Sequence, residues 1–289
     1  MSTTLLSHVA GRLHLSFCYD RAYQRTRLLT CEQEPPLRIV RTFPLAQGGT
    51  LLHLHNLSGG VLGGDRLTVE IDVGPEARVQ LTTTGATRVY RSRPGIETAQ
   101  QRCAVRIEAG GLLEYLPDEL IPFADSRYQQ VTRIEMEHDA GLFWWETIAP
   151  GRLAHGESFA YESLQIESEI LAAGQPIACE RYKLEPRHAS LPSPARLGAY
   201  RYHTSFFICR VGLPAARWQS LEQDLTALAL QLTRPGEIAW GVSALVAHGL
   251  LVRAVSQRGY TIPPGLLAFW RKAKQALYGE NALPPRKMY

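Results

Sequence analysis

The strongest constraint on the fold is the alternation of aliphatic and polar side chains through the middle of the chain. Between Arg66 and Val73 every second residue is aliphatic, and the same period of two recurs after Pro75 and again around Cys103. Because successive side chains of a strand point to opposite faces, each segment predicts a strand with one apolar face. Helical patterning is confined to the last quarter of the chain. The sequence therefore predicts a mainly β protein.

These strands share a loose repeat, since several of them end at an acidic residue or alanine followed by a glycine. The turn glycines Gly74, Gly110, Gly141 and Gly174 are separated by 36, 31 and 33 positions. Spacing of about 30 residues suggests stacked strand–turn–strand units. Hairpins with a coincidental spacing are the alternative. The pattern favours stacked β-strands in a helical, solenoid-like arrangement.

Residues 142–145 read Leu-Phe-Trp-Trp, so a strand here is apolar on both faces. Such a strand must be covered on both sides. Either two layers of this protein sandwich it, or a partner protein covers one side. We favour the internal two-layer core.

Two helices are predicted near the C-terminus, over residues 218–232 and from Pro263 to about Gly279. The second helix carries an apolar stripe that includes Leu266, Trp270 and Leu277. Between the helices, residues 243–255 predict one strand, and residues 191–194 predict a loop. Because nothing resembles a linker, we expect a single domain over residues 1–289.

Composition excludes several classes of protein. The chain has 289 residues, of which 45% are hydrophobic, and no apolar run reaches the length of about 20 residues that a membrane span needs. Residues 1–10 show no secretory signal, so we expect a cytoplasmic protein with no membrane partner. The net charge of +4 is scattered, which argues against a nucleic-acid partner. The five cysteines are odd in number and far apart, as expected of small buried residues in a reducing compartment.

Known catalytic and ligand-binding motifs are not found. The segment around Gly59 and Gly64 has four glycines in six positions, but Asp65 follows where a phosphate-binding loop needs a basic residue. His53 and His55 would share one strand face and could begin a metal site, although two polar surface positions are the favoured interpretation.

Acidic residues at strand ends and turns are the remaining candidates for chemistry. They include Asp65, Glu146 and Glu157. Paired carboxylates could act as acid and base in glycoside hydrolysis. They could also bind a divalent ion loosely through water, cap turns, or pair with Arg66 or Arg152.

With these residues in hand, the chain resembles the UreD family of urease accessory proteins, called UreH in some bacteria. The matching segments, in the family's order, are SGGVLGGDRL (58–67), LTTTGATRVYR (81–91), LEYLP (113–117) with IPF (121–123), GRLAHGE (151–157) and the tail from Trp270 through Gly279 to Arg286. Thr84 stands where the family often has Gln, and Arg88 where it often has Lys. The chain ends in Met-Tyr instead of Trp, so Tyr289 is the candidate replacement for an aromatic anchor.

The resemblance implies a chaperone and not an enzyme. Such proteins bind apo-urease and the accessory protein UreF, and through UreF they recruit UreG, a nickel-binding GTPase, so that Ni²⁺ is inserted into the urease active site. It also implies a helical stack of β-strands with a few C-terminal helices and an internal tunnel for nickel. Nickel would be a cation in transit, with no cofactor bound permanently.

A nickel conduit must bind its cargo weakly enough to release it, and carboxylates hold late first-row ions less tightly than thiolates or histidine clusters. We therefore predict that Asp65, Glu146 and Glu157 line the nickel path.

An apolar surface is predicted to bind the partner proteins, because exposed apolar patches usually mark interaction sites. It comprises Trp144, Trp145, Leu266, Trp270 and Leu277. We expect the isolated chain to be poorly soluble and to become soluble with UreF.

Two other functions are compatible with the residues. One is a carboxylate-dependent polysaccharide-active enzyme on a β-helical fold, which would need a long groove with two carboxyls about 5–10 Å apart. The other is a plain binding module without metal traffic.

Overall fold

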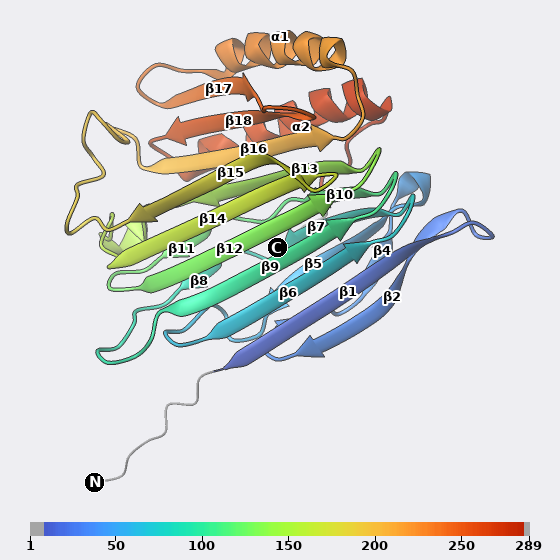
Figure 1. The fold of residues 1–289 in the computed structure, drawn as a ribbon. Coiled ribbons are helices and arrows are strands. Elements are labelled where there is room, and N and C mark those ends of the chain that lie inside the picture. Colours follow the sequence, from blue (N-terminus) through green and yellow to red (C-terminus); the bar gives the residue numbers. More distant parts are fainter. Residues whose placement is uncertain (1–8, 286–289) are drawn as a thin grey trace.

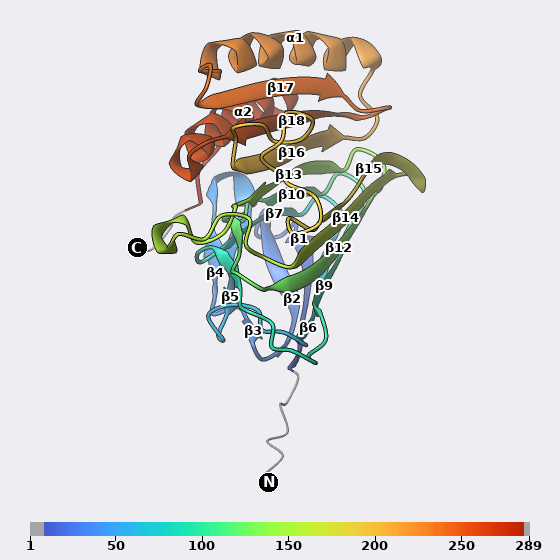
Figure 2. The same ribbon diagram turned by 90° about the vertical axis from the view of Figure 1, so that its left-hand side faces the viewer.

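Two β-sheets face one another, and two helices cover the outer side of the second sheet at one end (Figures 1 and 2). The computed structural model describes residues 9–285. The roles suggested for Tyr289 and the Met-Tyr terminus lie outside the described residues.

The first sheet has seven strands. Their spatial order is β15 (Gln175–Leu184), β14 (Ser163–Ala172), β12 (Arg127–Met136), β9 (Ala99–Ile107), β6 (Arg66–Val73), β1 (Ala10–Asp20) and β2 (Arg25–Glu34).

The second sheet follows the order β17 (Ile238–Ala244), β18 (Gly249–Ser256), β16 (Tyr202–Arg210), β13 (Gly141–Ile148), β10 (Leu112–Tyr115), β7 (Arg78–Thr83), β5 (Thr50–Asn56) and β3 (Leu37–Arg38). The short strands β4 (Thr42–Pro44), β8 (Thr87–Val89) and β11 (Leu120–Pro122) pair beside this path.

The repeated turns connect the two sheets. The chain passes from β6 to β7, from β9 to β10 and from β12 to β13, so each unit adds one parallel strand to each sheet. The fourth turn, at Gly174, instead joins β14 to β15 as an antiparallel hairpin within the first sheet. The mainly β class is confirmed. The solenoid-like description of the whole chain and the single domain over residues 1–289 stay predictions.

Two hydrophobic cores meet at β13. Leu142 and Trp144 lie in the core between the sheets, whereas Phe143 and Trp145 lie in the core between the second sheet and the helices. The prediction that two layers of the protein itself sandwich this strand is confirmed.

The helices are α1 (Ala215–Leu232) and α2 (Ile262–Tyr278), and Gly279 ends α2 in a left-handed conformation with φ 69°. Neither helix is long and apolar enough to cross a membrane. The prediction of one strand over 243–255 is wrong, because the chain reverses between β17 and β18 at His248, which has φ 59°. Aliphatic content alone does not encode such a turn.

The predicted partner-binding residues are all buried. They are Trp144, Trp145, Leu266, Trp270 and Leu277. The premise that they form an exposed surface is wrong, because Trp144 packs between the two sheets and the other four pack between the second sheet and the helices. A part for them in partner binding stays a prediction.

A buried ion pair joins α2 to the second sheet. The Nζ atom of Lys274 lies 2.9 Å from a carboxylate oxygen of Glu114, and Trp270 donates its indole N–H to the same carboxylate at 2.9 Å. Glu114 and Lys274 are both buried. Removing one member of a buried pair leaves an uncompensated charge in the core.

We predict that Lys274→Met lowers the free energy of unfolding by about 3 kcal/mol. Urea denaturation of the full chain measures this. The double variant Glu114→Gln/Lys274→Met has no buried charge, so it should recover most of the loss. A single variant as stable as the parent would contradict the assignment.

Candidate functional site

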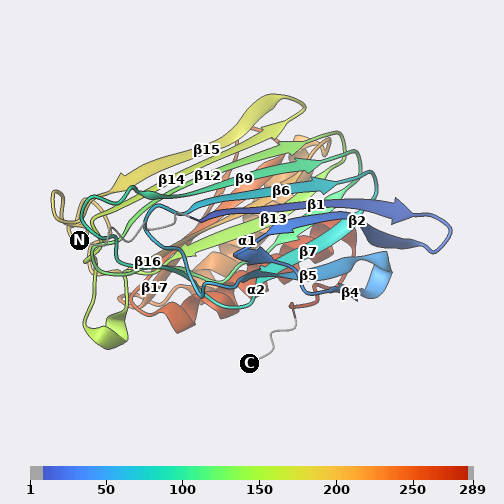
Figure 3. The ribbon, with the colours of Figure 1, turned by 90° about the horizontal axis from the view of Figure 1, so that it is seen from below.

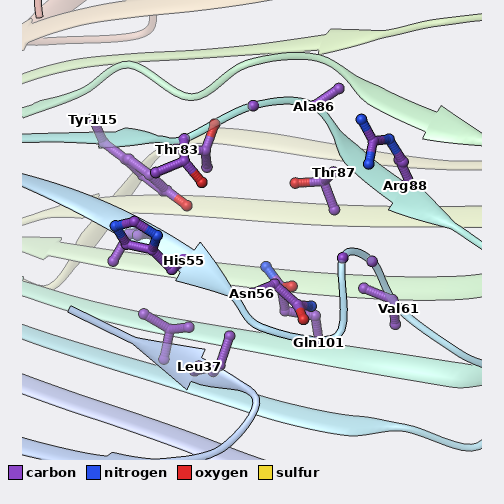
Figure 4. A pocket seen from close by; sticks show the side chains of 16 residues that line it. Leu37, His55, Asn56, Val61, Thr83, Ala86, Thr87, Arg88, Gln101 and Tyr115 are labelled. Carbon is purple, nitrogen blue, oxygen red and sulfur yellow. The ribbon is translucent and has the colours of Figure 1, made fainter. Parts of the chain in front are cut away.

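A cavity of about 250 Å³ opens where the glycine-rich loop 56–61 faces the turn 83–88 (Figure 4). We call it the mouth cavity. Its polar lining comes from both sheets, with Thr83 and Thr87 on one side and Gln101 on the other. Arg88 stands among the lining residues, and Tyr115 lies deeper, beside Thr83.

A second, smaller cavity of about 40 Å³ lies deeper between the sheets, and we call it the central cavity. It shares Thr83, Thr87, Gln101 and Tyr115 with the mouth cavity, so the two are contiguous. Glu146, from β13, is part of its wall and accepts a hydrogen bond from the side-chain amide of Gln130 on the opposite sheet.

A third cavity, of about 830 Å³, lies between β15 and the strands β16 and β18, and we call it the edge cavity. Glu180 lies in its wall, where Ser205 donates a hydrogen bond to the carboxylate at 3.2 Å. Arg253 forms an ion pair with the same carboxylate.

Two facing rows of polar side chains bridge the distance from the central to the edge cavity. In the first sheet, Thr132 stands beside Ser168, which stands beside Glu180. In the second sheet, Glu146 is paired with Ser205 in the same way. Because neighbours in register share a face, these side chains all point between the sheets.

The hydroxyl of Ser168, within this row, is buried and has no hydrogen-bond partner among residues 9–285. Buried polar groups normally have one. The central and edge cavities share no lining residue, and the polar rows lie between them. We call the three cavities and the connecting rows the interior passage.

Burial controls the protonation of the groups in and beside the passage. Burial, assisted by the nearby carboxylate of Glu180, raises the pKa of Glu146 from 4.5 to about 7, although the Gln130 hydrogen bond opposes the shift. Burial raises the pKa of the Cys103 thiol to about 12, so Cys103 is not a thiolate at neutral pH. Burial and the charge of Arg253 lower the pKa of His203 to about 4.

The predicted path residues have different surroundings. Glu146 lies in the passage, whereas Asp65 and Glu157 line none of its three cavities. The buried carboxylate of Asp65 accepts the backbone N–H of Leu62 at 2.9 Å and closes the glycine-rich turn beside the mouth. Glu157 pairs with Arg152 at 2.9 Å. Their place on a nickel path stays a prediction, and their contacts are those of structural residues.

Glu180 is not among the site residues predicted from the sequence, because the mixed charges of β15 suggest a strand that faces solvent. A signal was present: Cys103, Thr132, Ser168 and Glu180 interrupt the aliphatic face of successive strands at one register position.

The two histidines of β5 have different surroundings. His55 lines the mouth cavity, while the ring of His53 packs edge-on against Phe43 with the ring centres 5.5 Å apart. Within residues 9–285, no group of three or more His, Cys, Asp or Glu side chains is arranged to hold a metal ion.

Comparisons with known proteins identify the family. The family model described as "UreD urease accessory protein" matches residues 9–289. A urease accessory protein UreD from Herpetosiphon aurantiacus is 46% identical over 288 residues, which cover 100% of this chain and 99% of the relative. A UreD from Halalkalibacterium halodurans is 34% identical over 199 residues, which cover 68% of this chain and 72% of the relative. These matches place the chain among the urease accessory proteins. Within that class, it belongs to the UreD family.

We predict a specific pH dependence of stability from Glu146. Because its pKa is raised on folding, the folded protein binds more protons than the unfolded chain between about pH 4.5 and 7. The contribution of Glu146 to the free energy of unfolding should therefore fall as the pH rises through this interval. Glu146→Gln cannot ionise, so it should be more stable than the parent at pH 8 and differ less at pH 5. Urea denaturation at both pH values measures this, and an equal difference at both would contradict it.

Proposed function

We propose that this protein is a urease maturation chaperone and that Ni²⁺ crosses it through the interior passage. The observation that carries the proposal is the polar route between two otherwise apolar sheets, with carboxylates at Glu146 and Glu180. Polar residues between the sheets do not stabilise the core, because burying a polar group costs free energy unless the group has a hydrogen-bond partner. A route for a cation would give these buried polar residues a role.

The donors along the route suit a cargo that must be released. Carboxylates, hydroxyls and amides hold late first-row metal ions less tightly than thiolates or histidine clusters do. Cys103 lines the central cavity and burial keeps its thiol protonated, so Ni²⁺ binding to this thiol would have to displace a proton.

We further propose that the partners are apo-urease, UreF and UreG, that the complex forms in the cytoplasm and that the stacked units act as a solenoid-like scaffold. Membership of the UreD family and relatives named urease accessory proteins support this proposal. The chain would then transform no substrate of its own. Its role would be to carry nickel between partners that close on the two mouths of the passage.

The polysaccharide-active alternative is less well supported. Glu146 lies in a cavity of about 40 Å³, which is on the scale of a single water molecule and cannot admit a sugar ring. A plain binding module would not need the interior polar rows. Co-purification of the tagged chain with urease subunits separates nickel delivery from both.

We predict that Glu146→Gln and Glu180→Gln each lower the nickel content of urease matured by the assembled accessory complex. We expect a loss of about tenfold, which corresponds to roughly 1.4 kcal/mol per lost carboxylate contact. Nickel bound per urease active site, measured by metal analysis at limiting Ni²⁺, gives the result.

Glu169→Gln is the matched control, since it removes a partly exposed carboxylate that pairs with Arg133 and lines none of the three cavities. It should load urease normally. Recovery of the intact complex by affinity purification shows that assembly is unchanged. Full nickel loading by both passage variants in intact complexes would refute the proposed route.

A further inference from the structure

β2 is an edge strand of the first sheet and lies at the lower margin of the molecule (Figures 1 and 3). Within residues 9–285, its backbone pairs with no strand other than β1. Leu29, near its middle, is 66% exposed. Such an edge presents a row of unpaired N–H and C=O groups that can accept another strand.

A β-bulge decides which side chains of β2 share a face. Ser16 of β1 stands opposite Thr30, but the next residue stands opposite Leu28, so Leu29 is the extra residue. Thr30, Glu32 and Glu34 therefore share the outward face with Arg25 and Arg27, although the two groups differ in sequence parity.

Part of the inward face is already occupied. The side-chain carbonyl of Gln33 accepts the backbone N–H of Ile39 at 2.8 Å, and the hydroxyl of Thr26 accepts the backbone N–H of Arg78 at 2.8 Å. These contacts hold β2 against the second sheet. Its outward face and its backbone edge remain available to a partner, together with the exposed Cys31 on the inward side.

The charges on the outward face are self-complementary. An antiparallel two-fold pairing of two β2 strands, centred on Thr30 with the bulged Leu29 left out of the register, sets Arg25 opposite the second copy's Glu34 and Arg27 opposite the second copy's Glu32. Inward-facing residues also meet inward-facing residues in this register, because the bulge corrects the parity. Opposite charges directly across a strand pair stabilise it, whereas like charges oppose it.

We propose that β2 is a docking surface for a second copy of this chain, which joins two first sheets edge to edge about a two-fold axis. Charged residues and bulges usually protect an edge from pairing. Here the basic half and the acidic half of β2 are ordered so that two antiparallel copies attract one another. An isologous contact of this kind closes on itself and forms a dimer without further growth.

The contact is small, so the dimer should be weak and dependent on concentration and salt. Exposed ion pairs are screened as ionic strength rises. Before association, Arg27 pairs with Asp20 at 2.9 Å and Glu32 lies 3.8 Å from Arg12. Dimerisation would exchange these ion pairs for pairs between the two copies. The exchange therefore adds only a modest free energy of association beyond that of the backbone hydrogen bonds.

A charge-reversal cycle tests the proposal on the full chain. Sedimentation velocity over a range of concentrations should show a monomer–dimer equilibrium for the parent. Arg27→Glu and Glu32→Arg should each shift it to monomer, because like charges then face each other twice in the pair. The double variant Arg27→Glu/Glu32→Arg should restore the dimer, because an acidic side chain at position 27 then faces a basic one at position 32 of the second copy.

Arg181→Glu is the control, since it makes the same change on β15, the opposite edge strand of the sheet. It should dimerise like the parent. Circular dichroism confirms that each variant is folded. A parent that stays monomeric, single variants that still dimerise, or a double variant that does not recover would overturn the proposal. Loss of the dimer in Arg181→Glu alone would assign the interface to β15 and overturn it as well.

Discussion

The fold depends on burying both faces of β13. Its alternate side chains pack into two different cores, so the strand ties the first sheet on one side to the helices on the other. Trp144 stacks on Phe207 in one core with ring centres 5.2 Å apart, while Trp145 meets Trp270 edge-on in the other at 6.3 Å. Removing either layer would expose a continuous row of large apolar side chains. This constraint explains why the C-terminal helices pack closely on the second sheet.

The interior passage is the exception to this apolar packing. Each strand–turn–strand unit adds a strand in the same register to each sheet, so a polar residue at one position of the repeat stacks beside polar residues of the neighbouring units. Cys103, Thr132 and Ser168 stack in this way on parallel strands, and Glu180 extends the row across the β14–β15 hairpin. A repeat that builds a core by stacking can also build a route through that core, at the cost of buried polar groups that need partners.

The outer face of the first sheet carries charged side chains. These side chains form ion pairs across neighbouring strands, as between Arg12 of β1 and Glu70 of β6 at 2.8 Å, and these pairs keep the outer face of the sheet polar. On β2 the bulge at Leu29 places the two acidic residues on the same face as the two basic ones. One extra residue therefore changes an ordinary solvated edge into a self-complementary one.

The amino-acid sequence alone determined the mainly β class, the two C-terminal helices and the double burial of residues 142–145, because period-two and helical patterns are local and record which side faces a core. It also pointed to Glu146 as a carboxylate in an apolar strand, and to the family. Only the tertiary structure decided that Asp65 and Glu157 are held by local contacts, that residues 243–255 reverse direction, and that Glu180 faces inward. Those outcomes depend on strand register and on which sheet each strand joins, and long-range pairing of this kind leaves no mark within a single segment.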